Sequence, residues 1–246
     1  MSLRVVTALA AGASAQMFWP NLQELEKEVL QAPQEADVEV EVGVFVNPKL
    51  CDPSVNQSAG YLKASASSNY FFWLFESRSA PATDPLIMWL SGGSGCSSQL
   101  ALFGENGPCT VSEDGKSTIP NPYSWHMNAN VMWVDQPAAV GFSTGLGTHD
   151  EAGVADNMYT FLQGFFKEFP QYQKTKFHIF GESYAGHCVP EISHKIWEMN
   201  KACSGMKIPL AGIAIGNGLT NPEEQYKWYA EMGHTGARAE GGHAPA

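Results

Sequence analysis

A serine flanked by small residues is the first feature of this sequence that could do chemistry. The apolar run Phe177–Phe180 leads directly into the segment GESYAG, which places Ser183 between Gly181 and Ala185. Small residues at these positions permit a sharp strand-to-helix turn with the serine at its apex. Such a turn directs the hydroxyl toward the N–H groups at the start of a helix, which can stabilise an oxyanion. Small residues also surround serines in ordinary turns, so the motif alone leaves both interpretations open.

A glycine-rich segment after an earlier apolar run offers a partner for this serine. The run Leu86–Leu90 is followed at once by SGGSGCSS, which occupies residues 91–98. Glycines at this density let the backbone approach a ligand closely and turn N–H groups toward it. A phosphate-binding loop is excluded because the GK[ST] ending of that motif is absent. A Gly-Gly loop after an early strand is what a serine turn of this kind needs as its second oxyanion donor.

Six motifs in a fixed order extend this pair to a family resemblance. Together they resemble the serine carboxypeptidases, an α/β-hydrolase family that removes C-terminal residues from peptides, mostly in acidic lysosomal or vacuolar compartments. The motifs are WLSGGSGCSS (89–98), ENGP (105–108), NPYSW (121–125), DQP with VGFS (135–137 and 140–143), GESYAG (181–186) and IGNG (215–218). The resemblance extends from about Val40 to Met232.

The resemblance implies a role for each matching position. Ser183 would be the nucleophile, and the backbone N–H groups of Gly93 and Tyr184 would form the oxyanion hole. Neither a metal nor a cofactor is expected.

A second set of residues would recognise the carboxylate at the end of the substrate. The resemblance places Glu105 and Glu182 there, with Ser91 and a backbone N–H from Gly92. Two close carboxyl groups and an incoming carboxylate cannot all be ionised, so a shared proton would raise the pKa of the pair. For Glu105, a solvated loop carboxylate remains the alternative.

Three positions depart from the family pattern near these residues. Ser91 stands where the family usually has Asn, so carboxylate recognition by its shorter side chain would be weaker. Ser94 stands where the family has Pro, and Cys188 where it often has an aromatic residue. None of these changes removes the nucleophile.

The acid and the base of a catalytic triad are not evident. In α/β-hydrolases they follow the serine in the chain. Only 63 residues follow Ser183 (246 − 183), and none of them is aspartate. His187 is expected to be structural, and His126, His149, His178 and His194 to lie at the surface or in a satisfied core. We therefore expect a C-terminally truncated chain that lacks the downstream Asp and His.

Two hypotheses about function follow. The first is a serine-type carboxypeptidase, or a close relative acting on esters, that uses the Ser183 nucleophile and a backbone oxyanion hole. The alternative is a catalytically inactive fragment or pseudoenzyme with at most a peptide-binding role. Either would bind peptide or protein C-termini.

The elements that must position these residues follow from hydrophobic periodicity. Acidic and apolar residues alternate over Val38–Val46, which predicts a strand with one wet face. The runs Tyr61–Ala64 and Tyr70–Glu76 predict an antiparallel pair. Four short apolar runs suit strands buried on both faces of a parallel sheet; they are Leu86–Leu90, Val131–Val134, Phe177–Phe180 and Leu210–Ile215.

Two helices separate the later strands, over Glu151–Phe169 and Glu191–Cys203. The order predicts an α/β-hydrolase-type, mostly parallel sheet with helices on both faces, of which only the N-terminal part is present. We expect this partial domain over residues 38–232. A helical lead over 16–37, including an amphipathic helix at Asn21–Ala32, would precede it, and an unstructured tail would fill 233–246.

Charge and composition exclude some classes of binding partner. The net charge is −11 without a basic cluster, which excludes nucleic acid and an anionic membrane surface as partners. The five cysteines show no metal-like spacing, and their odd number leaves at least one without an internal partner. That thiol is either a buried apolar cysteine or one whose partner lies outside the chain. The oligomeric state is not indicated.

The N-terminal sequence suggests where in the cell the protein is sent. Residues 1–15 have the layout of a secretory signal peptide with cleavage after Ala15, and a frayed helix is the alternative. The sequon at Asn56 agrees with a secretory route. We expect a secreted, lysosomal or vacuolar protein without a membrane anchor after signal removal.

Overall fold

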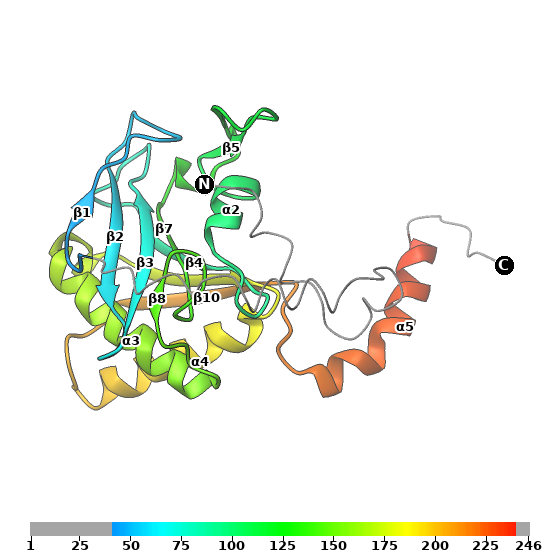
Figure 1. Cartoon of the computed structure of the whole chain (residues 1–246). Coiled ribbons are helices and arrows are strands. Elements are labelled where there is room, and N and C mark those ends of the chain that lie inside the picture. The colour runs from blue at the N-terminus through cyan, green and yellow to red at the C-terminus, as the bar shows by residue number, and fades with distance from the viewer. Residues whose placement is uncertain (1–40, 240–246) are drawn as a thin grey trace, which may run out of the picture. The chain divides into compact units, whose positions relative to one another are not determined.

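A mixed sheet forms the centre of the computed structural model, which describes residues 41–239. The predicted signal segment, the helical lead and residues 38–40 lie outside the described residues. Eight strands form the sheet in the order β1-β2-β3-β7-β4-β9-β10, with β8 paired to β3 (Figure 1). Their bounds are β1 Phe45–Val46, β2 Gln57–Lys63, β3 Ser68–Phe75, β4 Leu86–Leu90, β7 Asn130–Val134, β8 Thr144–Gly145, β9 Phe177–Glu182 and β10 Leu210–Gly216.

The four apolar runs form the parallel part of this sheet, as predicted. Strand β4 pairs in parallel with both β7 and β9, and β10 pairs in parallel with β9. Every residue of β4 and β7 is buried, which explains why these strands lack polar alternation. Strands β2 and β3 form the expected antiparallel pair.

The register of the parallel strands decides where the motifs meet. Leu90, the last residue of β4, pairs with Gly181 near the end of β9. Both strands run the same way, so the chain leaves them at the same edge of the sheet. The segment that begins at Ser91 therefore emerges beside the turn that contains Ser183.

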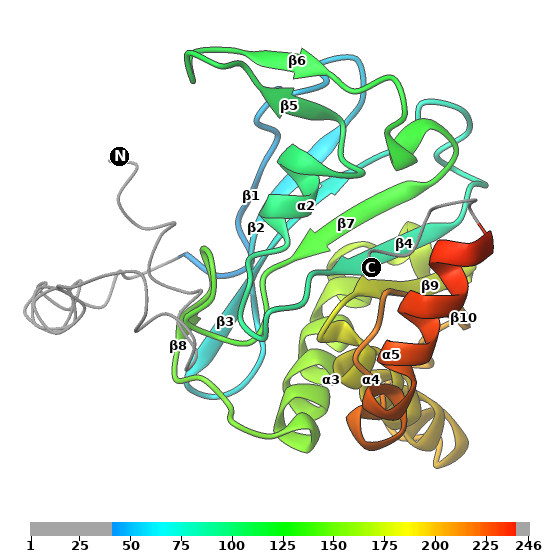
Figure 2. The same ribbon diagram turned by 90° about the vertical axis from the view of Figure 1, so that its right-hand side faces the viewer.

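Helices cover both faces of the sheet, which confirms the predicted layering. On one face lie α3 (Glu151–Glu168) and α4 (Ala185–Lys201), and on the other lie α2 (Gln99–Gly104) and the hairpin of β5 (Cys109–Val111) and β6 (Thr118–Pro120) (Figure 2). Two short 3-10 turns, η2 (Trp125–Met127) and η3 (Pro170–Lys174), lie between the larger elements. Within residues 41–239, no helix has the length and apolarity needed to cross a bilayer.

Helix α3 has the predicted ends. The Asp150 side chain accepts a 2.7 Å hydrogen bond from the N–H of Gly153 and caps the helix. The helix stops before Pro170, which begins η3. Phenylalanines from α3 build one core cluster with β3, including Phe161 and Phe165 against Phe72.

Helix α4 begins earlier than the predicted Glu191. It starts at Ala185, directly after the serine turn, and contains Pro190. The proline makes the sequence look like a helix boundary because it removes a backbone donor. Burial of Ala185, Cys188 and Val189 in the core holds the first turns in place despite that loss.

Two further expectations differ from the structure. In the described part, 41–46, of the stretch predicted as one strand over Val38–Val46, Phe45–Val46 alone forms a strand, with an isolated bridge between Val42 and Tyr61. The predicted tail is helical at its start, because α5 (Pro222–Ala239) continues through residues 233–239. Local helix propensity and acidic residues in the first turn can form such a helix without a packed core. Residues 240–246 lie outside the described part.

A disulfide and a buried polar cluster connect the segment before β2 with β5 and η2, a region that we call the buried corner. Cys51 is bonded to Cys109, and Cys96, Cys188 and Cys203 are free thiols, in agreement with the expectation that at least one cysteine has no internal partner. Next to the disulfide, His126 Nε2 lies 2.8 Å from Asp52 Oδ2 and its Nδ1 lies 2.5 Å from Ser124 Oγ.

The cluster keeps His126 neutral and Asp52 charged. Burial lowers the pKa of His126, and the Arg78 charge adds to this, while Asp52 opposes it. Burial acts to raise the pKa of Asp52, but hydrogen bonds from Ser54, His126 and Arg78 outweigh it and hold that pKa well below its usual range. His126 is therefore a satisfied core histidine, one of the two outcomes expected for it.

Candidate active site

The serine turn has the strained geometry that the motif predicts. Ser183 has φ +59°, in the left-handed region that non-glycine residues rarely adopt. Its N–H donates a 3.0 Å hydrogen bond to the carbonyl of Gly216, and its carbonyl accepts a 2.8 Å bond from Leu219 N–H. A Cβ atom at Gly181 would lie 2.6 Å from the Cβ of Ala185, so this position must be glycine. The N–H and the carbonyl of Ser183 are thus held by the last residue of β10 and by the segment that follows it.

The glycine-rich loop packs directly against this turn. A Cβ atom at Gly92 would lie 2.5 Å from the backbone N of Tyr184 and 2.6 Å from the Cβ of Ser183. Backbone can approach so closely only where no side chain intervenes. The two motifs that sequence analysis linked, more than 80 residues apart, are therefore in contact.

Two backbone donors at this contact have no protein acceptor. Among the described residues, neither the N–H of Gly93 nor the N–H of Tyr184 donates a hydrogen bond. Tyr184 also stands at the N-cap of α4, where the positive end of the helix dipole lies. Donors of this kind can stabilise a negatively charged oxygen next to Ser183.

A buried aspartate fixes the glycine-rich loop, and sequence analysis gave it no role. Asp135 Oδ1 accepts hydrogen bonds from Ser97 Oγ at 2.7 Å and from Ser98 N–H at 2.8 Å. Its Oδ2 accepts a 2.9 Å bond from Phe142 N–H, which ties in the VGFS segment. Burial raises the pKa of Asp135, and these hydrogen bonds oppose that rise. The position directly after the fully buried strand β7, in the DQP motif, was the available signal.

The two glutamates lie close enough for the charge of Glu182 to act on Glu105. Glu182 ends β9, and Glu105 directly follows α2. Partial burial raises the pKa of Glu105, and the charge of Glu182 raises it further. Glu105 is exposed, which agrees with the alternative of a solvated loop carboxylate, and the charge of Glu182 acts on it in addition. Ser91 is buried nearby, where its hydroxyl accepts a 3.3 Å hydrogen bond from Trp89 Nε1.

No base for the serine is found within the described residues. Over residues 41–239, no histidine or carboxylate forms a hydrogen bond with the Ser183 hydroxyl. The ring of His187 packs on the ring of Tyr184, with 4.9 Å between centroids, which agrees with a structural role.

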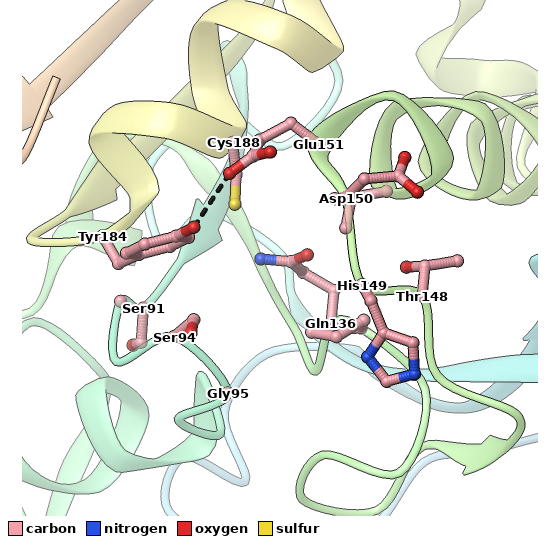
Figure 3. A pocket seen from close by; sticks show the side chains of 13 residues that line it. Ser91, Ser94, Gly95, Gln136, Thr148, His149, Asp150, Glu151, Tyr184 and Cys188 are labelled. Carbon is pink, nitrogen blue, oxygen red and sulfur yellow. Dashed lines mark hydrogen bonds between the residues drawn. The ribbon is translucent and has the colours of Figure 1, made fainter. Parts of the chain in front are cut away.

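A cavity of about 250 Å³ adjoins the site without containing the nucleophile. It lies beside Tyr184 and the glycine-rich loop, and the beginning of α3 forms its far wall (Figure 3). Gly92 and Tyr184 are shared between the cavity and the serine turn, whereas Ser183, Glu105 and Glu182 do not line the cavity.

The sequon asparagine lies away from these residues. Asn56 is exposed, immediately before β2, and its side chain donates a 3.0 Å hydrogen bond to Glu76 Oε2.

Comparison with known proteins places this geometry in a family. The family model "Serine carboxypeptidase" matches residues 48–240. Serine carboxypeptidase-like 48 of Arabidopsis thaliana is 50% identical over 179 residues, which cover 70% of this chain and 35% of that protein. Carboxypeptidase Y homolog A of Arthroderma otae is 45% identical over 183 residues, covering 74% and 33%. The chain thus spans about a third of the length of these relatives.

A solved structure agrees with the sequence comparisons. The prohormone-processing carboxypeptidase Kex1(Δ)p of Saccharomyces cerevisiae matches with a TM-score of 0.69 and 29% identity, over 82% of this chain and 47% of that one. The sheet is therefore that of an α/β-hydrolase, as predicted. On these grounds, the chain belongs to the serine carboxypeptidase family.

Proposed function

We propose that this chain carries the nucleophile and the substrate-recognition groups of a serine-type carboxypeptidase. The observation that carries the proposal is the contact of Gly92 with Ser183 and Tyr184, because it sets two free backbone donors beside a strained serine. Ser183 Oγ would attack the carbonyl of the last peptide bond. The N–H groups of Gly93 and Tyr184 would stabilise the resulting oxyanion, a contribution worth about 3 to 4 kcal/mol per donor in other acyl-transfer sites.

Activation of Ser183 requires a general base, which the described residues do not supply. The proposal therefore assigns this chain the nucleophile, the oxyanion donors and carboxylate recognition, and leaves the triad acid and histidine outside residues 41–239. Without them the chain would bind peptides, and this non-catalytic role is the alternative.

Selection of a C-terminus would come from the glutamate pair. The interaction between Glu105 and Glu182 favours a proton on one of them, which then donates a hydrogen bond to the substrate carboxylate. Ser91 and the N–H of Gly92 would complete the site. Recognition by a protonated pair is suited to an acidic compartment, which agrees with the secretory signal and sequon expected from the sequence and with a lysosomal, vacuolar or secreted location.

A covalent probe and a paired substrate test the proposal. The folded chain is treated with a fluorophosphonate, and mass spectrometry maps the label. We expect attachment at Ser183, at a slow rate because no base among residues 41–239 activates its hydroxyl, and none in Ser183→Ala. In parallel, release of the last residue is followed for an N-blocked dipeptide, its C-terminal amide and its ester, at acidic and neutral pH.

The results separate the hypotheses. Absence of label in well-folded protein would contradict the assignment of Ser183 as the nucleophile. Labelling without release from any substrate favours the peptide-binding alternative, whereas release from the ester alone points to an esterase.

A further inference from the structure

The cavity beside Tyr184 contains polar groups that the proposed reaction does not use. Four segments supply its walls: the glycine-rich loop, Gln136 and Pro137 after β7, the start of α3, and Tyr184 with Cys188 from α4. Figure 3 shows their side chains arranged around a common space, with the amide of Gln136 in the middle.

Two buried oxygen atoms in this wall lack a hydrogen-bond donor. Neither Gln136 Oε1 nor Thr148 Oγ1 has a partner among the described residues. The Gln136 side chain is nearly inaccessible, at 5% exposure. A buried polar atom left unpaired costs about 1–3 kcal/mol, so these atoms favour an occupant that donates hydrogen bonds.

The charges at the cavity select the sign of that occupant. Glu151 stays ionised because the 2.8 Å hydrogen bond from the Tyr184 hydroxyl lowers its pKa. Asp150 adds a second carboxylate. Its Oδ1 caps α3, where the negative charge offsets the positive end of the helix dipole. Among residues 41–239, no lysine or arginine lines the cavity, and the one histidine that does, His149, is exposed. This field opposes an anion and attracts a cation.

The apolar part of the wall selects the shape of the occupant. Val154 and Pro137 line the cavity, and burial raises the pKa of the Cys188 thiol, so the sulfur is neutral. Methylene groups can pack on these surfaces while a charged end reaches the oxygens, as lysine and arginine side chains do. The volume of about 250 Å³ is smaller than the roughly 300–1,000 Å³ of sites for drug-sized ligands.

We propose that this cavity binds a lysine or arginine side chain of a peptide, with the cationic group between Glu151 and Gln136. The cavity shares Gly92 and Tyr184 with the serine turn, so the basic residue would lie near the scissile bond. The peptide as source rests on the proposed function, whereas the binding of the cationic side chain does not.

A set of small ligands tests the pocket without turnover. Binding of N-acetyl-argininamide and N-acetyl-lysinamide to the whole chain is measured by isothermal titration calorimetry. N-acetyl-citrullinamide, which keeps the shape of arginine without its charge, is the matched ligand. We expect the two cations to bind at least about tenfold more tightly, because charge-assisted hydrogen bonds are the stronger ones. Equal binding of citrulline, or no binding of either cation, would overturn the proposal.

Variants locate the binding. Glu151→Gln keeps an acceptor for the Tyr184 hydroxyl but removes the charge, and we expect it to weaken the cations at least about tenfold. Gln136→Met removes the unpaired oxygen at similar volume and should also weaken them. Glu168→Gln makes the same charge change at the far end of α3 and should leave affinity unchanged.

Thermal melts first confirm that each variant folds. Full affinity in Glu151→Gln would place the cation elsewhere and overturn the assignment. Since these measurements need no reaction at Ser183, a failed pocket and a failed nucleophile give different results: loss of cation binding leaves probe labelling intact, and loss of labelling leaves cation binding intact.

Discussion

The carboxylate of Asp135 and the hydroxyl of Ser97 are joined by a 2.7 Å hydrogen bond that fixes the glycine-rich loop to the end of β7. Asp135 also accepts from the N–H groups of Ser98 and Phe142, so one buried side chain holds two loops around the serine turn. It touches no proposed reacting group and acts by positioning Gly92 and Gly93.

Asp135→Asn tests this positioning role. The new NH₂ group would face either the N–H of Phe142 or the donors from Ser97, Ser98 and Gln99, so a buried hydrogen bond is replaced by an unfavourable donor–donor contact. We expect a loss of about 2 to 4 kcal/mol in the free energy of unfolding and slower labelling of Ser183. Urea denaturation and labelling kinetics measure the two effects. Asp150→Asn is the matched control, because asparagine is an equally good helix cap; equal losses in both variants would contradict the assignment.

Gly92→Ala tests the contact between the loop and the turn. The added Cβ would overlap the backbone of Tyr184 and the side chain of Ser183, so the loop must move away. We expect the rate of probe labelling at Ser183 to fall at least about 100-fold, as when an oxyanion donor is lost. Gly233→Ala, in α5, has open space at its Cβ and should label at the original rate. Unchanged labelling in Gly92→Ala would mean that the loop does not contribute donors.

Glu105 should make substrate affinity depend on pH. Its pKa lies above the ordinary value of 4.5, so the folded protein keeps this proton at pH values where an ordinary glutamate has lost it. Affinity for a carboxylate should therefore be highest in acid and fall as pH rises through the raised pKa. Calorimetry of a blocked dipeptide with Ser183→Ala, between about pH 4 and pH 7, measures this dependence.

The matched variants separate Glu105 from other acids. Glu105→Gln always presents a neutral donor, so affinity should vary much less with pH. Glu113→Gln, on an exposed turn, should keep the original dependence. A pH profile that survives Glu105→Gln would assign the proton to another group.

His126 should make the fold less stable in mild acid. Its pKa in the folded protein is below the ordinary 6.5, so the unfolded chain binds more protons in the window between the two values. The free energy of unfolding should therefore fall as pH decreases below about 6.5 and be fully restored above it. Asp52, whose pKa is lowered, stays charged throughout and loses its contribution only below its ordinary 3.8.

Urea denaturation at about pH 7.5 and about pH 5 measures the effect. His126→Gln should be less stable at both values but lose less stability between them. The exposed His149→Gln should behave as the original protein does. If His126→Gln retains the full difference, another group is responsible.

Much of the fold could be predicted from hydrophobic periodicity. The runs Leu86–Leu90 and Val131–Val134 are apolar throughout because both faces are covered, and they are strands β4 and β7. Predictions were wrong where local and tertiary signals disagree. Pro190 marks a boundary locally, yet packing of the first turns of α4 overrides it.

The residues of the site likewise fall into those that could be predicted from the sequence and those that could not. Ser183 and Gly92 were found because strained turns and close backbone contacts require particular residue types. Asp135 and Gln136 were not assigned roles, because their importance depends on partners from distant loops. The cavity and its unpaired oxygens could not be predicted, since empty space leaves no periodic pattern in a sequence.

The buried corner contains a serine, a histidine and an aspartate in hydrogen-bonded series: Ser124, His126 and Asp52. Ser124 is 3% exposed and His126 is fully buried, so a reagent reaches that hydroxyl only after the corner opens. Unfolding also separates the three side chains, so Ser124 is out of reach in the native chain and has no adjacent base in the unfolded one. Ser124 therefore adds no background to labelling measured at Ser183.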